Sequence, residues 1–134
     1  MELQIKIIGV LLVLLSFIHA AFPRYFNWVK EFSSVTLINR QMMYVHTFFV
    51  ALVLLLMGVL CFFSADDLVS SPLGKRISLG ICVFWTARLF IQFFGYSSSL
   101  WKGKRFETTI HVLFCLLWSY MAIVFGAVYF TGKN

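Results

Sequence analysis

The chain has 134 residues, of which 61% are hydrophobic and 12% are charged, and its formal net charge is +6. Soluble domains are about half apolar and a quarter charged, so this composition excludes a water-soluble globular protein and makes the lipid bilayer the main solvent. The basic residues are scattered over short loops between apolar segments. That pattern excludes nucleic acid as a partner and indicates contacts with membrane lipid.

Four apolar segments divide the chain, and each is close to the ~20 residues that a helix needs to cross ~30 Å of hydrocarbon. They cover about residues 5–22, 42–63, 77–96 and 108–130. Because lipid offers no hydrogen-bond partners to the backbone, each segment is predicted to be an α-helix. Residues 1–134 are therefore expected to form a single all-α transmembrane domain, a four-helix bundle with up-down topology.

The first segment resembles a secretory signal peptide in its Lys6, its apolar core and the small residues near its end. We interpret it instead as a retained helix that ends near Phe22, with Pro23 marking a helix break or a new helix start. In the loop that follows, apolar residues recur at helical spacing and predict a short amphipathic helix in the membrane interface. These residues are Tyr25, Trp28, Val29, Phe32 and Val35.

The other two loops are shorter, and their charges bear on orientation. The second loop, SADDLVSSPLGKR, is polar, and the third, SSSLWKGKRFE, carries Trp101 as an interfacial anchor beside basic residues. In an up-down bundle the first and third loops share one side, where six Lys and Arg residues lie against four on the other side. This bias predicts cytoplasmic first and third loops and outward termini.

Polar side chains from all four segments lie at a similar depth. His19, His46, Gln92 and His111 are each about four or five residues from the end of a segment, roughly 6–8 Å below the surface of the first and third loops. Arg88 is roughly 12 Å deep, and its long side chain can reach back toward them. An arginine at mid-bilayer costs about 2.5–3.5 kcal/mol on insertion scales. We therefore expect these groups to meet inside the bundle, where acceptors or an anionic ligand lower that cost.

The helical faces agree with these depths in three of the four segments. Arg88 and Gln92 share a stripe with small and polar residues of the third segment, as His111 does in the fourth and His19 in the first. His46 is turned about 100° from Thr47, which lies on the small and polar stripe of the second segment. His46 therefore fits the polar layer less well than the other members.

The first functional hypothesis is a metal or haem site. His19, His46 and His111 could form a three-histidine metal site with an open position, or two of them could hold a haem. The alternative is that these histidines make hydrogen bonds between helices and hold no metal. The chain contains no HxxH, HxxxH or ExxH motif, so the sequence does not identify the metal.

The second hypothesis is a pocket for an anionic or amphipathic ligand, such as a lipid headgroup or a quinone. Arg88 would supply the charge, Gln92 and Tyr96 the hydrogen bonds, and a histidine an acid or base. Alternatively, Arg88 forms a structural pair with Glu107 or with helix-end carbonyls. The further candidate ligand-binding residues are Tyr44, Arg40 and Glu107.

Catalytic motifs are absent from the chain, which has no GxSxG, no glycine-rich phosphate loop and no clear Cys/His nucleophile pair. We predict a multi-pass membrane protein whose polar His/Arg/Gln site in one leaflet binds a metal ion or haem. This site would act on, or pass electrons to, a small lipophilic or anionic ligand. The alternative is a non-catalytic scaffold or accessory subunit, in which polar residues only hold helices together. A homo-oligomer or a partner membrane subunit is compatible with both.

Overall fold

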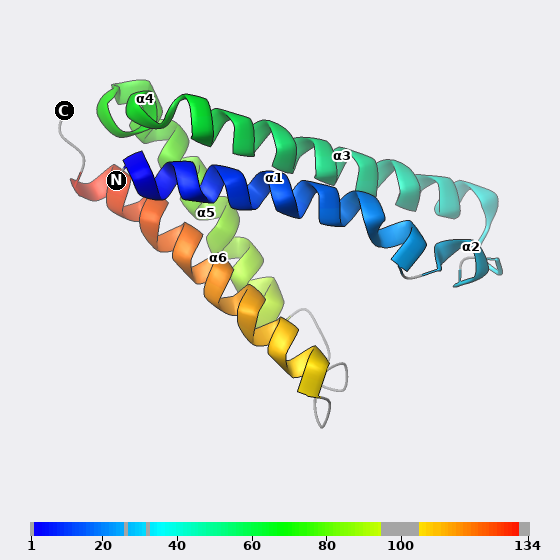
Figure 1. Cartoon of the computed structure of the whole chain (residues 1–134). Coiled ribbons are helices and arrows are strands. Elements are labelled where there is room, and N and C mark those ends of the chain that lie inside the picture. The colour runs from blue at the N-terminus through cyan, green and yellow to red at the C-terminus, as the bar shows by residue number, and fades with distance from the viewer. Residues whose placement is uncertain (1, 26, 32, 95–104, 132–134) are drawn as a thin grey trace. The chain divides into compact units, whose positions relative to one another are not determined.

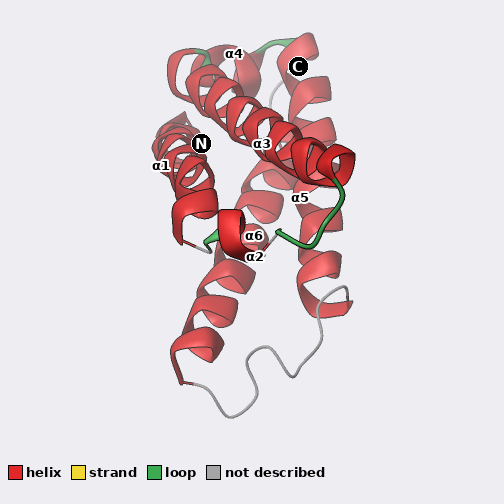
Figure 2. Cartoon of the chain, turned by 90° about the vertical axis from the view of Figure 1, so that its right-hand side faces the viewer, coloured by secondary structure: helices red, strands yellow, loops and turns green. Residues whose placement is uncertain are grey.

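The computed structural model describes residues 2–25, 27–31, 33–94 and 105–131, and these ranges contain helices and no strand (Figures 1 and 2). The all-α class predicted from the sequence is therefore confirmed. In chain order the helices are α1 (Glu2–Tyr25), α2 (Trp28–Glu31), α3 (Leu37–Phe63), α4 (Ala65–Ser70), α5 (Pro72–Phe94) and α6 (Arg105–Thr131).

Four of these helices, α1, α3, α5 and α6, are long and apolar enough to cross a membrane. They confirm the four predicted spans, although α3 and α5 begin five residues before the apolar segments that predicted them, at Leu37 and Pro72. Both helices begin before their apolar segments because the backbone hydrogen bonds of a helix do not require apolar side chains. Tyr96, the predicted end of the third span, lies outside the described residues.

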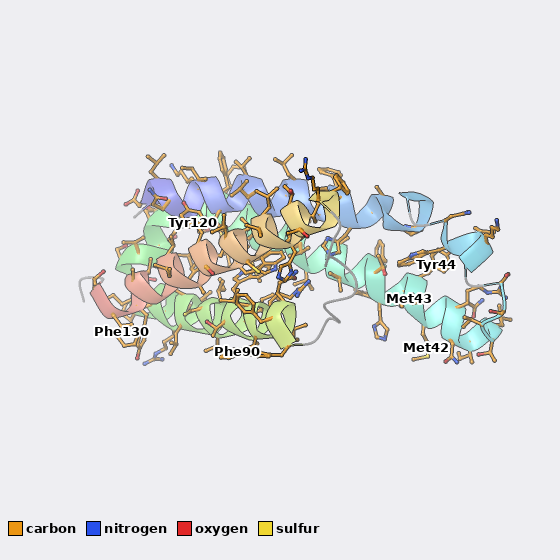
Figure 3. The ribbon with its side chains drawn as sticks, turned by 90° about the horizontal axis from the view of Figure 1, so that it is seen from below. Met42, Met43, Tyr44, Phe90, Tyr120 and Phe130 are labelled. Atoms are coloured by element: carbon orange, nitrogen blue, oxygen red, sulfur yellow. The ribbon has the colours of Figure 1, made fainter. Side chains whose placement is uncertain are left out.

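Large apolar side chains cover the outer faces of the long helices. Phe63, Phe94 and Phe130 are 75%, 80% and 79% exposed, and Figure 3 shows Phe90 and Phe130 on the surface of their helices. Soluble proteins rarely expose apolar faces of this extent, so these faces are suited to contact with lipid. The chain is accordingly a multi-pass integral membrane protein.

The chain divides into two compact units. The first unit, Leu3–Ala65, contains α1, α2 and α3, and the second, Asp66–Asn134 with Met1–Glu2, contains α4, α5 and α6. Each unit is built on one pair of long helices.

In the first unit, α1 and α3 are antiparallel and approach each other at small residues. The Ser16 hydroxyl donates to the carbonyl oxygen of Ala51 over 2.7 Å. Further along, a Cβ atom added to Gly9 would lie 2.7 Å from the Gly58 carbonyl oxygen, and one added to Gly58 would lie 2.7 Å from the Gly9 carbonyl oxygen. Neither glycine accepts a side chain unless the backbones separate, which is the packing that small residues allow between membrane helices.

The first loop folds against this pair. The structure has a four-residue helix, α2, within the segment predicted to form an amphipathic helix, and Val35 lies in a bend after it. The helix follows Asn27, whose φ of 53° suits asparagine. Trp28 of α2 contacts Tyr44 of α3 edge-on, with ring centroids 5.4 Å apart. Pro23 lies inside the last turn of α1 and does not break it. So close to the helix end, proline removes only the bond to the carbonyl of His19.

In the second unit, α5 and α6 form an antiparallel pair. The Cys82 thiol donates to the carbonyl oxygen of Ala122 over 3.3 Å. One turn along, the indole rings of Trp85 and Trp118 stack with centroids 4.8 Å apart and planes 10° from parallel. Small and aromatic side chains thus alternate along the contact between these helices.

The second loop was predicted to be a polar connection, but the structure folds part of it into α4. Ser71 caps α5, because its Oγ accepts the N–H of Gly74 over 2.8 Å. Pro72 occupies the first helical position, where its missing N–H costs nothing. A Cβ atom on Gly74 would overlap the carbonyl oxygen of Asp67, so glycine allows α4 to turn back closely onto α5.

The close approach of α1 and α3 predicts a specific sensitivity to Gly58→Ala. The added methyl group must push the two backbones apart, and overpacking of this kind costs about 1–3 kcal/mol of unfolding free energy. We expect the loss in SDS-titration unfolding of the purified protein in mixed micelles, followed by tryptophan fluorescence.

The matched control is Gly80→Ala on α5, where an added Cβ meets no atom within 4 Å. Higher helix propensity should leave this variant unchanged or stabilise it by up to about 1 kcal/mol. Equal stability of the two variants would contradict the close α1–α3 approach.

Candidate functional site

Three polar side chains join α5 to α6 by hydrogen bonds. Arg88 and Gln92 lie one turn apart on α5, and Arg88 Nη1 donates to Gln92 Oε1 over 3.3 Å. Gln92 Nε2 lies 2.8 Å from Nδ1 of His111 on α6. Gln92 is only 5% exposed, so its amide connects the charged and aromatic groups within the helix pair. The structure thus brings together three of the residues predicted to share one layer.

Arg88 sets the direction of hydrogen-bond donation in this network. A guanidinium has only donors, so Gln92 turns its oxygen toward Arg88 and its NH₂ group toward His111. His111 Nδ1 must then accept, which places the proton of the neutral imidazole on Nε2. That nitrogen lies 3.6 Å from the Cys115 sulfur, one turn along α6. Donation therefore runs in one direction, from Arg88 through Gln92 and His111 to Cys115.

Aromatic rings hold the arginine from another side. The Arg88 guanidinium carbon lies 5.2 Å from the centroid of the Trp118 ring. Trp118 in turn stacks on Trp85 and on Phe114, with centroids 4.8 and 5.4 Å away. A cation over an indole ring gains about 0.5–2 kcal/mol, more when water is excluded. Amide and indole together offset much of the cost of a charge at this depth.

Two buried donors in this cluster have no acceptor among the described residues. The indole nitrogens of Trp85 and Trp118 are buried and have no hydrogen-bond partner within the part of the chain that the structure describes. The guanidinium of Arg88 likewise carries only donors, and its Nη1 donates to Gln92. A buried donor left unpaired costs about 1–3 kcal/mol. The cluster is therefore suited to bind an oxygen-bearing group.

The remaining ligand-binding candidates lie in the first unit or outside the described part of the structure, so they stay predictions. Tyr44 and Arg40 lie on α3 in the first unit, where Tyr44 packs against Trp28. Tyr96 lies outside the described residues. Glu107 belongs to α6, but its side chain is outside the described part of the structure.

The three histidines have different surroundings. The His19 ring is half-buried, and its Nδ1 donates to the Leu15 carbonyl over 2.9 Å, one turn back on α1. His46 is exposed on α3, and His111 belongs to the α5–α6 network. Among the described residues, no group of three or more His, Cys, Asp and Glu side chains is placed to hold a metal ion. Since His19 and His46 belong to one unit and His111 to the other, the three-histidine site stays a prediction.

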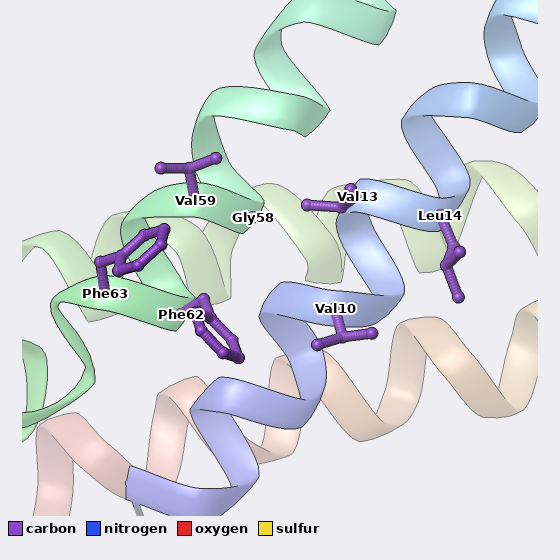
Figure 4. Close-up of a pocket in the computed structure, with 7 residues that line it drawn as sticks. All are labelled: Val10, Val13, Leu14, Gly58, Val59, Phe62 and Phe63. Atoms are coloured by element: carbon purple, nitrogen blue, oxygen red, sulfur yellow. The ribbon is translucent and has the colours of Figure 1, made fainter.

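An apolar groove of about 250 Å³ lies between α1 and α3 (Figure 4). Its walls come from α1, including Val10 and Val13, and from α3, including Val59 and Phe62, with Gly58 at its floor. Valine, leucine, glycine and phenylalanine line it throughout, so it offers no group for chemistry. The polar α5–α6 cluster is the stronger candidate for a functional site.

Trp85, Cys115 and Trp118 were not among the site residues predicted from the sequence. Spacing on α6 contained part of the signal, because Cys115 and Trp118 follow His111 at intervals of four and three. The remaining signal came from the antiparallel pairing of α5 and α6. Once Gln92 faces His111, Trp85 must face Trp118 two turns further along both helices.

Comparisons of the chain with protein families, curated protein sequences and solved structures give no match. The function is therefore argued from the chemistry of the α5–α6 cluster.

The bond between Gln92 and His111 predicts a measurable coupling between α5 and α6. We expect a double-mutant cycle of Gln92→Leu and His111→Leu to give a coupling of about 0.6–1.7 kcal/mol, the range found for hydrogen bonds between membrane helices. Unfolding free energies from SDS titration supply the four corners of the cycle. The control pairs Gln92→Leu with Thr109→Val, since the Thr109 hydroxyl donates to the Arg105 carbonyl on its own helix. If the first pair is additive like the control, the interhelical bond is absent.

Proposed function

We propose that the α5–α6 unit is an intramembrane binding site for a small lipophilic ligand whose polar end carries anionic or carbonyl oxygen atoms. Lipid phosphates, carboxylates and quinones share this chemistry. The observation that supports the proposal is the pair of buried indole N–H groups beside a guanidinium, which have no acceptor among the described residues. Such a cluster gains stability when an acceptor enters it.

Each member of the cluster has a distinct role in this proposal. Arg88 supplies the charge, and its planar fork of donors suits paired oxygen atoms. Gln92 holds Arg88 and His111 in register across the two helices. His111 presents an Nε2–H group whose contact with the Cys115 sulfur, at 3.6 Å, is weak enough for a ligand oxygen to replace. The same proton makes His111 the candidate acid if chemistry follows binding.

A metal ion or haem is the second candidate, through His19, His46 and His111. The bond from His19 Nδ1 to Leu15 places the lone pair of a neutral ring on Nε2, the nitrogen that would ligate a metal. His111 is less suited, because its lone pair on Nδ1 is directed at Gln92. This difference is the reason for preferring the oxygen-bearing ligand at the α5–α6 cluster.

The alternative function is a non-catalytic scaffold or accessory subunit. In that case Arg88, Gln92 and His111 only hold α5 against α6, and the exposed apolar faces bind lipid, a second copy or a partner membrane subunit. The close α1–α3 contact at Gly9 and Gly58 suits either function. Ligand binding distinguishes the two.

Topology and location complete the proposal. We propose an up-down arrangement of the four spans, with the first and third loops in the cytoplasm and both termini outside. The support is the excess of Lys and Arg in those loops. We place α2 in the membrane interface because Val29 is 78% exposed beside Lys30, an apolar and a basic side chain suited to that layer.

Binding is tested with amphiphiles that quench tryptophan, using protein in nanodiscs of neutral lipid. One arm of the experiment uses a brominated fatty acid, and a second arm uses a short-chain benzoquinone. The fatty alcohol with the same brominated chain is the uncharged control. We expect saturable quenching of Trp85 and Trp118 in a background in which Trp28 and Trp101 are phenylalanine. Arg88→Gln should weaken binding at least about tenfold, as loss of a charge-assisted bond of about 1.5–3 kcal/mol requires.

Arg76→Gln is the matched control, since Arg76 is an exposed cation near the other end of α5. Quenching by the fatty acid alone assigns an anionic ligand, and quenching by the quinone alone assigns a carbonyl ligand. If neither quenches saturably in the folded protein, the ligand site is refuted and the scaffold is favoured.

The metal or haem candidate has a separate check. If it is correct, the purified protein shows a Soret band or about one equivalent of a transition metal by elemental analysis. His19→Ala and His111→Ala should each remove it, because each takes away a direct ligand. Thr109→Val on the exposed side of α6 is the control that should retain it. Protein without a Soret band or bound metal would exclude this candidate.

A further inference from the structure

The segment MMYVH near the start of α3 presents two thioethers and an imidazole on one exposed surface. Met42 and Met43 are 48% and 44% exposed, and His46 is exposed as well. Figure 3 shows Met42 and Met43 on this stretch of α3. Neither methionine is used in the α1–α3 contact at Gly9 and Gly58 or in the α5–α6 cluster.

Helical geometry places these three side chains together. At 3.6 residues per turn, Met42 and Met43 are about 100° apart, and His46 falls between them, about one turn further along. Tyr44 points to the other side of the helix, where it packs against Trp28. His46 is four residues from Met42 and three from Met43, the two spacings at which side chains on a helix are neighbours. An ion bound at His46 is therefore within reach of either thioether.

The length of α3 sets the depth of this surface. The helix has 27 residues, which span about 40 Å, whereas the hydrocarbon core is about 30 Å thick. Polar residues gather at its N-terminal end, at Asn39, Arg40 and Gln41, while its C-terminal end carries Phe62 and Phe63. The surplus length therefore lies at the N-terminal end and brings the Met/His surface to the boundary between lipid and water.

The donor atoms select the kind of ion. Thioethers are soft and uncharged and prefer Cu(I), and imidazole also binds copper well. The segment from Leu37 to Thr47 contains no Asp, Glu or Cys, so hard divalent cations lack the ligands that they prefer. We propose that Met42, Met43 and His46 form a Cu(I)-binding site on the exposed surface of α3. The proposal also accounts for the position of His46, which does not fit the inward stripe of its helix.

This site is independent of the proposed ligand site on α5 and α6. It lies in the other unit, uses different donors and would take a cation where the α5–α6 cluster would take an oxygen-bearing ligand. It also differs from the three-histidine candidate, because it needs no ligand outside one helical turn of α3.

The first test observes the methionines directly, with Ag(I) as a redox-stable substitute for Cu(I). The full-length protein in detergent, labelled with ¹³C at the methionine methyl groups, is titrated with Ag(I) and followed by NMR. We expect one equivalent to shift the methyl signals of Met42 and Met43, and Zn(II) to shift neither. The signals of Met57 and Met121 are internal references that should stay in place. Shifts confined to Met57 and Met121, or no methionine shift at all, would overturn the proposal.

The second test measures Cu(I) affinity under reducing conditions by competition with bathocuproine disulfonate. Thiols also bind Cu(I), so the comparison is made between variants that retain Cys61, Cys82 and Cys115. We expect the M42L/M43L double variant to lose one equivalent of bound Cu(I), and H46A to bind that equivalent at least about tenfold more weakly. Leucine conserves the volume and apolar character of methionine, so the fold is kept.

Met57→Leu, further along the same helix, is the matched control and should retain the full stoichiometry. Unchanged stoichiometry and affinity in M42L/M43L would assign all Cu(I) binding to other groups and reject the α3 site. A far-UV spectrum identical to that of the unsubstituted protein shows that a loss of binding is not a loss of fold.

Discussion

A guanidinium inside a membrane helix pair has to be matched by acceptors, and the α5–α6 unit is arranged around that requirement. Lipid cannot solvate a guanidinium, and an arginine at mid-bilayer costs about 2.5–3.5 kcal/mol on insertion scales. Gln92 supplies an amide oxygen one turn away, and Trp118 supplies the face of its indole ring. Neither carries a formal negative charge. The guanidinium is therefore positioned but not neutralised by these two groups.

This arrangement fixes the direction of the hydrogen bonds. Because Arg88 can only donate, the amide of Gln92 has one orientation, and the orientation of the amide sets the tautomer of His111. A carboxylate in place of Gln92 would neutralise the charge but could not donate to the imidazole. Glutamine thus carries the direction of hydrogen bonding from the arginine to α6 and adds no negative charge beside it. Together with the buried indole N–H groups, this polarity is the physical basis of the proposed site.

Helix packing gives the two pairs different properties. Between α1 and α3 the backbones approach at Gly9 and Gly58, where no side chain fits, so that pair is held by close contact along the helices. Between α5 and α6 the contact contains indole rings, a thiol and an amide. Polar and aromatic groups are needed where helices must hold a charge, and small residues suffice where they only pack. The difference separates a structural pair from a candidate functional pair.

The sequence predicted the four spans and the α-helical class because hydrophobic length is a strong signal. It also placed Arg88, Gln92 and His111 in one layer, since depth along a helix follows from residue number alone. It did not predict that Trp118 would hold the guanidinium, because aromatic residues occur throughout this chain and their partners depend on the register between helices. The capping of α5 by Ser71 and Pro72 was visible in the sequence, but the polar composition of the segment favoured a loop. His46 was predicted as the weakest member of the polar layer, because it is turned about 100° from the small and polar stripe of its helix, and its side chain is exposed.

The most direct measurement of the central interaction is the tautomer of each histidine. In ¹⁵N-histidine-labelled protein at neutral pH, the nitrogen chemical shifts of the imidazole rings report which nitrogen carries the proton. The direction of donation from Arg88 through Gln92 predicts the Nε2–H form for His111, while the bond from His19 to Leu15 predicts the Nδ1–H form for His19. The two rings should therefore differ within one sample. An Nδ1–H form of His111 would contradict the account, because Gln92 would then have to turn its NH₂ group toward the guanidinium.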